Sequence, residues 1–456
     1  MNIVIAGGGT AGWLAALFFA NSQPNKHNVT LVESTQLGII GAGEGSTRIL
    51  TRVLNNKFFD TGSNISEFMA NTDATLKLGI RHKNWTGDGS SYYAPLDGTE
   101  THSFSPDVDF LTALCKDGPE GMHASSKLGK CFIDKNYTEV TALHFDGTLI
   151  GKHFKKILEN KVKHIDSIVS NVTLKEDGSI KSLILENNEE VFGDLFIDCT
   201  GFSRILMKAL GVEWNSYSEN LPVNTAIPFI LPRPKDDPEP LTVAHALSAG
   251  WMWQIPTASR IGCGYVFSDK YISVEDAQKE VELLLGHEID PIKVIKFESG
   301  RCDVLWEKNC LALGLASSFA EPLEATSIHT TIVQLVTFCF EFMSDTWEKT
   351  YDLVGQKRYN SRMQKLYDDI RDFLVIHYQG GRTDSEFWRH ISSGKTLTPF
   401  SREILERSKH KVPGFFNYDY YYGSAGAPLW NWVLAGTNNI TKDTAKKELE
   451  LYGIIV

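Results

Sequence analysis

Apolar and polar positions over the first 33 residues follow the pattern of two short buried strands around one apolar helix. Residues 2–6 (NIVIA) form an apolar run of strand length, and residues 13–20 (WLAALFFA) are apolar, free of proline and helix-forming in composition. A second apolar strand follows at residues 28–32. Strand, helix and strand in this order predict a βαβ unit, whose two strands lie parallel in one sheet.

The segment between the first strand and the helix is rich in glycine. Gly7, Gly9 and Gly12 have the G-x-G-x-x-G spacing. In that motif the first glycine permits a tight turn, the second lets backbone approach a pyrophosphate, and the third lets the helix pack on the strand. Glu33 ends the second strand about twenty residues later, where a carboxylate binds an adenosine ribose. We therefore expect a bound dinucleotide, with phosphates at the helix N-terminus near Thr10 and Ala11.

Residues 37–47 (LGIIGAGEGST) contain four glycines and therefore predict a loop with unusual backbone angles. A flexible connector is one interpretation. A loop that lies along the cofactor is the favoured one, because the segment follows the glycine motif closely. The residues expected to make these contacts are Gly43, Glu44, Ser46 and Thr47.

Two later runs repeat the pattern of a buried strand that leads into a glycine turn. Residues 193–202 pass from an apolar strand through Asp198 to a glycine, and residues 311–316 do the same. Each run could be one more strand and turn of the sheet. Next to the N-terminal motif we favour cofactor contacts, from Asp198 in the first run and from Leu315 and Phe319 in or just after the second.

Beyond these runs, residues 223–300 alternate as strands, and the chain is mainly helical from Ile328 to its end. Trp251 and Trp253 would share one face of a strand, which usually indicates core packing. Either Thr326 or Ser327 is suited to be the N-cap of a long helix whose N-terminus attracts an anion. From the pattern alone, Lys77 is a solvated surface lysine.

Composition excludes several classes of protein. The net charge of −11 over 456 residues argues against a general nucleic-acid binder, which needs a basic face. Seven scattered cysteines without a C-x-x-C pair indicate reduced thiols and no structural metal site. The apolar run at residues 328–343 contains His, Gln and Glu, so we expect a buried helix and no membrane span. With the first strand at the N-terminus and no signal peptide, a cytoplasmic protein is expected.

Several motifs together resemble the flavin-dependent halogenases of the tryptophan halogenase family. GGGTAGW at residues 7–13 is similar to that family's FAD motif, and GWMWQIP at residues 250–256 fits its W-x-W-x-I-P signature. TLKLGI at residues 75–80 and EPLEATSIH at residues 321–329 match the blocks that hold its catalytic lysine and glutamate. Further similar blocks are ALHFDG at 142–147, DLFIDCTGF at 194–202, RDFLVIHY at 371–378 and DSEFW at 384–388.

The resemblance implies an activity and a role for each matching residue. Reduced FAD, supplied by a separate flavin reductase, would react with dioxygen and a halide to give hypohalous acid. Lys77 would relay the halogen to an electron-rich aromatic substrate, and Glu324 would polarise the halogen donor or take the ring proton. The remaining implied sites are a halide site at Thr326 and Ser327, a tunnel walled by Trp251, Trp253 and Pro256, and a substrate-facing pair, His102 and Phe104.

The implied fold is α/β. An FAD-binding Rossmann-like domain of the flavin monooxygenase type, with mixed sheets, would comprise residues 1–90 and 141–330. A mainly helical substrate-binding region would comprise residues 91–140 and 331–456. The substrate is left open among indole-, phenol- and tryptophan-like aromatics, as are the halide and a homo-oligomeric state. The alternatives are a flavin monooxygenase that hydroxylates on the same scaffold and a flavoprotein that only binds.

Overall fold

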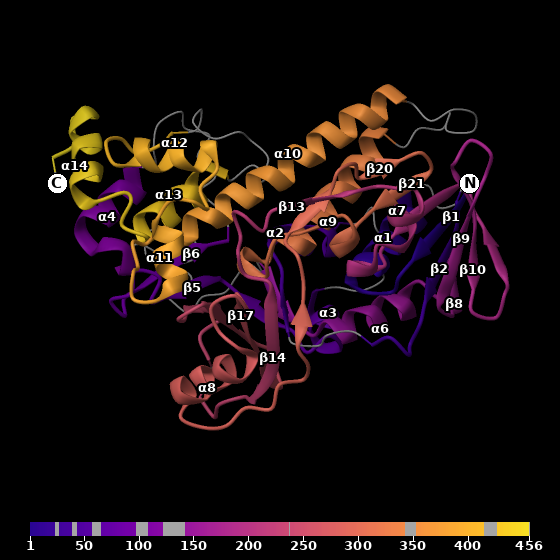
Figure 1. The fold of residues 1–456 in the computed structure, drawn as a ribbon, viewed down its shortest axis with the longest axis horizontal. Coiled ribbons are helices and arrows are strands. Elements are labelled where there is room, and N and C mark those ends of the chain that lie inside the picture. Colours follow the sequence, from indigo (N-terminus) through magenta and orange to yellow (C-terminus); the bar gives the residue numbers. More distant parts are fainter. Residues whose placement is uncertain are drawn as a thin grey trace. The chain divides into compact units, whose positions relative to one another are not determined.

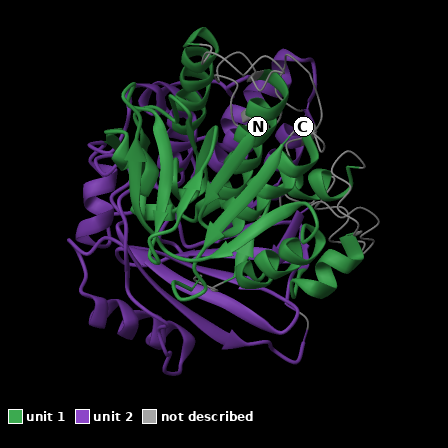
Figure 2. Ribbon diagram, turned by 90° about the vertical axis from the view of Figure 1, so that its right-hand side faces the viewer, with its two compact units in different colours: residues 1–74, 145–216, 299–367 green, residues 75–144, 217–298, 368–456 purple. Residues whose placement is uncertain are grey.

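The computed structural model describes most of the chain. The described residues are 1–22, 27–38, 43–56, 65–96, 108–121, 142–236, 238–342, 353–414 and 426–455. The predicted substrate-facing pair, His102 and Phe104, lies outside them. The chain divides into two compact units, each assembled from three stretches (Figure 2). Unit 1 comprises residues 1–74, 145–216 and 299–367, and unit 2 comprises residues 75–144, 217–298 and 368–456.

Unit 1 is organised around a six-stranded sheet in which all neighbours are parallel except for one antiparallel edge strand. In sheet order the strands are β20 (Trp306–Glu307), β21 (Cys310–Ala312), β12 (Leu195–Asp198), β1 (Asn2–Ala6), β2 (Asn28–Glu33) and β8 (Val162–Asp166). Helix α1 (Thr10–Ser22) connects β1 to β2, so the predicted βαβ unit is confirmed. Its residues 12–21 are all buried, as an apolar helix inside a core requires.

The other elements of unit 1 are short sheets and helices around this core (Figure 1). The two small sheets are β9 (Val169–Leu174), β10 (Ile180–Leu185) and β11 (Glu190–Phe192), and β13 (Trp214–Ser216), β19 (Gly300–Cys302) and β22 (Ser318–Phe319). Strand β3 (Glu44–Gly45) is part of a third small sheet. The helices are α2 (Arg48–Leu54), α3 (Ile65–Asn71), α6 (Gly147–Ile157), α7 (Ile205–Ala209), α9 (Thr326–Thr337) and the part of α10 (Leu353–His377) up to Tyr367.

Unit 2 is organised around a seven-stranded sheet in which the only parallel pair is β15 with β5. In sheet order the strands are β18 (Ile295–Lys296), β14 (Thr225–Pro232), β17 (Arg260–Phe267), β16 (Gly250–Pro256), β15 (Leu241–Ala246), β5 (Gly79–Lys83) and β6 (Ser91–Pro95). Strands β4 (Thr75–Lys77) and β7 (Ala142–Phe145) pair antiparallel in the small sheet whose order is β3, β7, β4.

Helices make up most of the rest of unit 2. They are α4 (Val108–Gly121), α8 (Val274–Leu285), α11 (Glu386–Ser392), α12 (Pro399–Ser408), α13 (Gly426–Gly436), α14 (Lys442–Leu451) and the part of α10 from Asp368. The predicted helical C-terminal part is confirmed wherever the chain is described there. Helix α8 was missed within a segment predicted as strands, although Ser273 caps it by accepting a hydrogen bond from the Asp276 N–H.

This division differs from the expected one, which assigned residues 75–90 and 217–298 to the FAD-binding domain. Strands β5 and β6 are hydrogen-bonded into the same sheet as β14 to β17, so these stretches share one core. Inside it, the Trp85 indole N–H donates to the Ala244 carbonyl at 2.9 Å. Helix α4 is interrupted at Gly118, which has a non-helical φ of 69° and is followed by Pro119.

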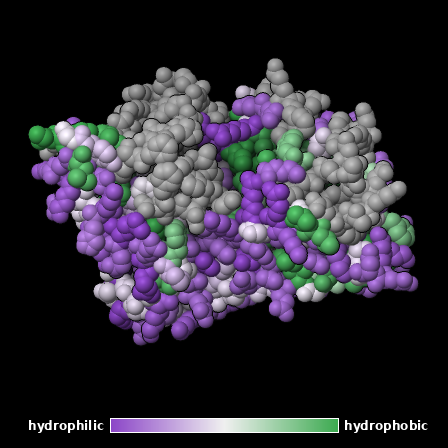
Figure 3. Space-filling model, turned by 90° about the horizontal axis from the view of Figure 1, so that it is seen from above, coloured by the Kyte–Doolittle hydropathy of each residue, from purple (hydrophilic) through white to green (hydrophobic). Residues whose placement is uncertain are grey.

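On the face drawn in Figure 3 hydrophilic residues predominate wherever residues are described, as expected of a chain with a net charge of −11. Within the described ranges, every helix is too short or too polar to cross a bilayer.

Candidate active site

The glycine motif of unit 1 combines two crowded positions with one open position. A Cβ on Gly7 would lie 2.1 Å from the Cys199 carbonyl oxygen, and one on Gly12 would lie 1.9 Å from the Gly7 carbonyl oxygen. Gly7 also has a φ of 107°, which disfavours any other residue. At Gly9, by contrast, no heavy atom lies within 4 Å of the Cβ position. The open position faces the start of α1, whose first turn has no acidic residue, so a pyrophosphate fits there.

Glu33 lies against this loop at the end of β2. A Cβ on Gly8 would overlap the Glu33 carboxylate, with 1.6 Å to its Oε2 atom. The other carboxylate oxygen, Oε1, is 2.8 Å from Nε2 of His164 on β8. His164 in turn stacks beside Trp13 of α1, with 6.0 Å between ring centroids. The position of Glu33 fits a ligand of the ribose. His164 was not identified from the sequence, because the pairing of β8 with β2 that brings it to Glu33 cannot be predicted from the spacing of residues.

The predicted cofactor loop is described from Gly43, which has a φ of 83°. Glu44 is half-buried, and desolvation raises the pKa of its carboxyl to about 7, although the hydrogen bond from Thr10 lowers it. The Thr10 hydroxyl donates to both Glu44 oxygens at 3.2 and 3.3 Å. Thr47 is paired with His329 of α9, at 2.9 Å from Oγ1 to Nδ1. These bonds attach the loop to α1 and α9, and the buried Ser46 lies between them.

Asp198 has a structural task that the sequence did not indicate. Its Oδ1 accepts hydrogen bonds from the N–H and hydroxyl of Thr200, at 3.0 and 2.6 Å. Its Oδ2 accepts from the N–H groups of Leu206 and Met207 in α7, both at 2.9 Å. Each carboxylate oxygen accepts two bonds, so Asp198 fixes the loop between β12 and α7. Its contact with the cofactor stays a prediction.

The turn that contains Leu315 packs against the start of α1. Gly314 has a φ of 60°, and a Cβ there would lie 2.6 Å from the Ala11 side chain. Leu315 follows directly, and Phe319 ends β22 with its ring 5.2 Å from that of Phe202. Both residues remain predicted cofactor contacts, on a turn that adjoins the glycine motif.

The segment before α9 has an uncommon backbone. Glu324 and Ala325 have φ values of 64° and 54°, so two successive non-glycine residues are left-handed. Such strain is typical of functional sites. Glu324 is 5% exposed. Because Ala325 is the residue before the helix, Thr326 and Ser327 are its first two residues, and the prediction that one of them is the N-cap was wrong. No side chain caps this N-terminus, and its first turn has no acidic residue, which suits an anion.

In unit 2, Lys77 is 1% exposed, so the expectation of a solvated lysine from the pattern alone was wrong. It ends β4 opposite Ala142 of the fully buried strand β7. Thr75, two residues earlier, donates its hydroxyl to the carbonyl of Pro256 at 2.5 Å. This bond joins the lysine strand to the end of β16, the strand that holds the W-x-W-x-I-P signature.

The two tryptophans of that signature are buried side by side on β16. Trp251 and Trp253 are 1% and 7% exposed, with 6.3 Å between ring centroids. Trp253 lies across Gly264 of the neighbouring strand, where a Cβ would come within 2.2 Å of the indole. The packing interpretation therefore holds, and it is compatible with a wall of bulky rings near Lys77.

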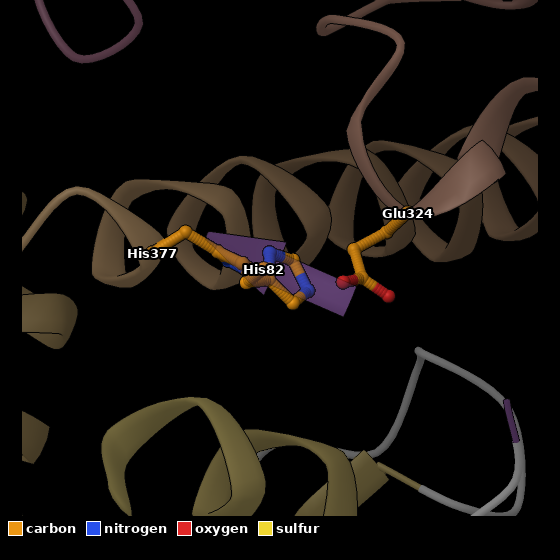
Figure 4. Close-up of side chains that lie close together, drawn as sticks. All are labelled: His82, Glu324 and His377. Carbon is orange, nitrogen blue, oxygen red and sulfur yellow. The ribbon is translucent and has the colours of Figure 1, made fainter. Parts of the chain in front are cut away.

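A pair of histidines in unit 2 was not predicted from the sequence. The ring centroids of His82 on β5 and His377 on α10 are 5.3 Å apart. Both side chains are labelled in Figure 4. His82 also stacks on Tyr92, at 4.5 Å and 9°. The His377 Nδ1 atom is 2.9 Å from the Phe373 carbonyl oxygen.

In unit 1 a parallel sheet has a glycine motif at the start of its first helix, with Glu33 beside that motif. In unit 2 a buried lysine lies beside the strand that holds the paired tryptophans. Together these features are typical of a dinucleotide-binding enzyme of the α/β class. The family model "Tryptophan halogenase" matches residues 2–447. The chain therefore belongs to the tryptophan halogenase family, and it is an enzyme, a flavin-dependent halogenase. The family implies FAD as the cofactor, and the open space at Gly9 fits it.

Individual relatives agree with this assignment along most of the chain. The 7-chloro-L-tryptophan 6-halogenase KtzR of Kutzneria sp. is 32% identical over 92% of this chain and 87% of its own length. The tryptophan 6-halogenase SttH of Streptomyces toxytricini is 31% identical over 96% and 90%, and its crystal structure superposes with a TM-score of 0.82. Xcc4156, a flavin-dependent halogenase from Xanthomonas campestris, has a TM-score of 0.84 at 28% identity over 98% and 93%. These structures support the predicted FAD-binding Rossmann-like fold.

Proposed function

We propose that this halogenase uses reduced FAD, dioxygen and a halide to form hypohalous acid, and that Lys77 relays the halogen to an electron-rich aromatic carbon. A tryptophan-like substrate is favoured over a simple indole or phenol, because the names of SttH and KtzR specify tryptophan and 7-chloro-L-tryptophan. Reduced FAD is supplied by a separate flavin reductase. The observation that supports the proposal most directly is the burial of Lys77 next to the signature strand.

Residues of unit 1 hold the cofactor and the halide. The start of α1 and the open space at Gly9 take the pyrophosphate, and Glu33 takes the ribose. Bound reduced FAD, together with dioxygen, supplies the oxidising capacity that converts halide into hypohalous acid. The N–H groups of Thr326 and Ser327, at the positive end of the α9 dipole, stabilise the halide by an amount on the order of 1 kcal/mol.

In unit 2, the amine of Lys77 orients the halogen for transfer. It donates a hydrogen bond to hypohalous acid, or as a neutral amine it takes the halogen from that acid, so that the O–halogen bond breaks and a haloamine and water form. Either role requires an amine that is fixed in place and shielded from bulk water. Trp251 and Trp253 exclude water and keep the aromatic substrate away from the oxidant. Glu324 polarises the halogen donor or takes the ring proton after substitution.

The test replaces Lys77 by alanine, with Lys175→Ala at the exposed β9–β10 turn as the matched control. Each protein is assayed with reduced FAD, each halide and a panel of tryptophan, indoles and phenols, with products read by mass spectrometry. We expect Lys77→Ala to lose halogenated product by about 100-fold or more, while FAD binding and hypohalous acid captured by a soluble trap persist. Full product formation would remove Lys77 from the mechanism. A hydroxylated product that needs no halide would contradict halogenation.

A further inference from the structure

We propose that His144 is a positioning residue for Lys77 and that, during catalysis, the lysine amine donates a hydrogen bond to Nδ1 of the neutral imidazole, an atom without a partner in the described structure. The imidazole would fix the direction of the amine without adding a negative charge. This inference rests on the proposed role of Lys77.

The strand register places the two side chains on one face. In the β4–β7 pair, Thr75 is opposite His144 and Lys77 is opposite Ala142. Directly opposite residues of an antiparallel pair point to the same side, so all four side chains share a face. His144 is thus the diagonal neighbour of Lys77, with a typical Cβ separation of about 7 Å that a lysine side chain spans. Ala142, directly opposite, leaves the space for it.

The imidazole is anchored at one nitrogen and unengaged at the other. Nε2 of His144 is 2.8 Å from the hydroxyl of Thr242 on β15. The side chain is 0% exposed, and among the described residues its Nδ1 atom has no hydrogen-bond partner. When Nε2 bears the proton and donates to Thr242, Nδ1 presents a lone pair. A buried acceptor without a donor is unfavourable, and the Lys77 amine is the donor that the register brings within reach.

Charge around the pair favours a neutral imidazole. Burial lowers the pKa of His144 well below its usual value, and the positive charge of Lys77 lowers it further. Strands β4, β5, β7, β15 and β16 contain no Asp or Glu, whereas β3, in the same small sheet as β7 and β4, contains Glu44. A carboxylate at this position would hold the lysine as an ammonium ion, whereas an imidazole acceptor lets the amine lose its proton.

Other titratable groups nearby divide between the two faces of the large sheet. His82 of β5 shares the face of Thr242, because Ile80 is paired with Thr242 and alternate residues share a side. Arg81, Lys83 and His245 lie on the opposite face, where the pKa of His245 is lowered to about 4, chiefly by burial. His82 is therefore the second titratable group to check when a pH profile is read.

The test compares two amide variants that each keep one half of the imidazole. His144→Gln retains a donor toward Thr242 and lacks the acceptor at Nδ1, whereas His144→Asn retains an acceptor near Nδ1 and lacks the Thr242 bond. We expect His144→Gln to lower kcat about tenfold with KM for the aromatic substrate within about twofold. The limb of the pH profile that reports Lys77 should shift to lower pH, because an ammonium ion that loses its acceptor releases its proton more readily. His144→Asn should have a kcat close to that of the wild type, and the Lys77 limb of its pH profile should lie at the wild-type pH.

The inference would be overturned if His144→Gln kept the wild-type kcat and pH profile, or if both amide variants were impaired equally. It would also be overturned if the Lys77 limb of the pH profile shifted in His82→Gln and not in His144→Gln. Thr242→Val, nearly isosteric, provides a second route if His144→Gln does not fold. It should lower kcat and shift the limb in the same direction, and a wild-type profile there would also overturn it. If Lys77→Ala loses activity while His144→Gln keeps the wild-type kcat and pH profile, only this inference is rejected. If Lys77→Ala remains active, the proposed function is rejected.

Discussion

Glu44 allows a quantitative prediction, because a half-buried carboxyl with a pKa near 7 links folding to pH. Burial raises the pKa of the Glu44 carboxyl in the folded protein from its ordinary value of 4.5 to about 7. The folded state therefore keeps a proton that the unfolded chain releases, and the free energy of unfolding falls as pH rises from 4.5 to 7. At 1.36 kcal/mol per pKa unit, a shift of about 2.5 units amounts to about 3 kcal/mol above pH 7.

The perturbation is Glu44→Gln, which keeps the shape of the protonated acid and cannot ionise. Its carbonyl can still accept the Thr10 hydroxyl hydrogen bond. We expect the difference in unfolding free energy, variant minus wild type, to increase by about 3 kcal/mol in favour of the variant between pH 4.5 and pH 8. Other titrating groups are shared by both proteins and cancel in the comparison.

The assay is urea denaturation of the cofactor-free proteins at several pH values, read by tryptophan fluorescence, with the m-value checked at each pH. Glu176→Gln, the same chemical change at an exposed turn, is the control and should track wild type at every pH. A stability difference between Glu44→Gln and wild type that stays constant across the pH range would refute the reasoning. So would a variant that becomes relatively less stable as pH rises.

Two further predictions concern catalysis and cofactor binding. Glu324→Gln should lower the rate of halogenated product formation by about 100-fold while flavin oxidation continues, measured by product chromatography beside oxygen uptake; an unchanged product yield would count against its role. Gly9→Ala should leave the melting temperature almost unchanged yet weaken FAD binding about tenfold, because its new methyl group enters space that only a ligand uses. Gly7→Ala should instead destabilise the fold by several kcal/mol, because its methyl group would overlap the Cys199 carbonyl. Equal melting temperatures for the two alanine variants would contradict this distinction.

The sequence was most informative where the evidence is local. The βαβ unit with Gly7, Gly9 and Gly12 was predicted correctly because strand, turn and helix are contiguous and each has its own periodicity. The start of α9 was misplaced by one or two residues, since an alanine in the left-handed region replaces the expected N-cap and no propensity scale anticipates it. The first and last residues of a helix depend on single backbone angles of this kind, whereas the presence of the helix does not.

Burial of the candidate catalytic lysine was not predictable from its own neighbours. Lys77 is buried because β7, about 65 residues further along the chain, pairs with its strand. His144 and His164 gain their significance in the same way, from registers between strands that are far apart in sequence. The resemblance to a family identified Lys77, but only strand pairing shows which side chains surround it.

The two left-handed residues before α9 have a consequence for any effort to make this enzyme more robust. A positive φ at alanine costs about 1 kcal/mol or more that glycine would avoid, so Ala325 is the position that a search for backbone relaxation would choose first. A glycine there would also widen the range of directions open to the Glu324 carboxylate. The substitution would therefore exchange backbone strain for a looser orientation of the carboxylate that we propose to be catalytic. Variants selected only for survival at high temperature should be screened for turnover as well.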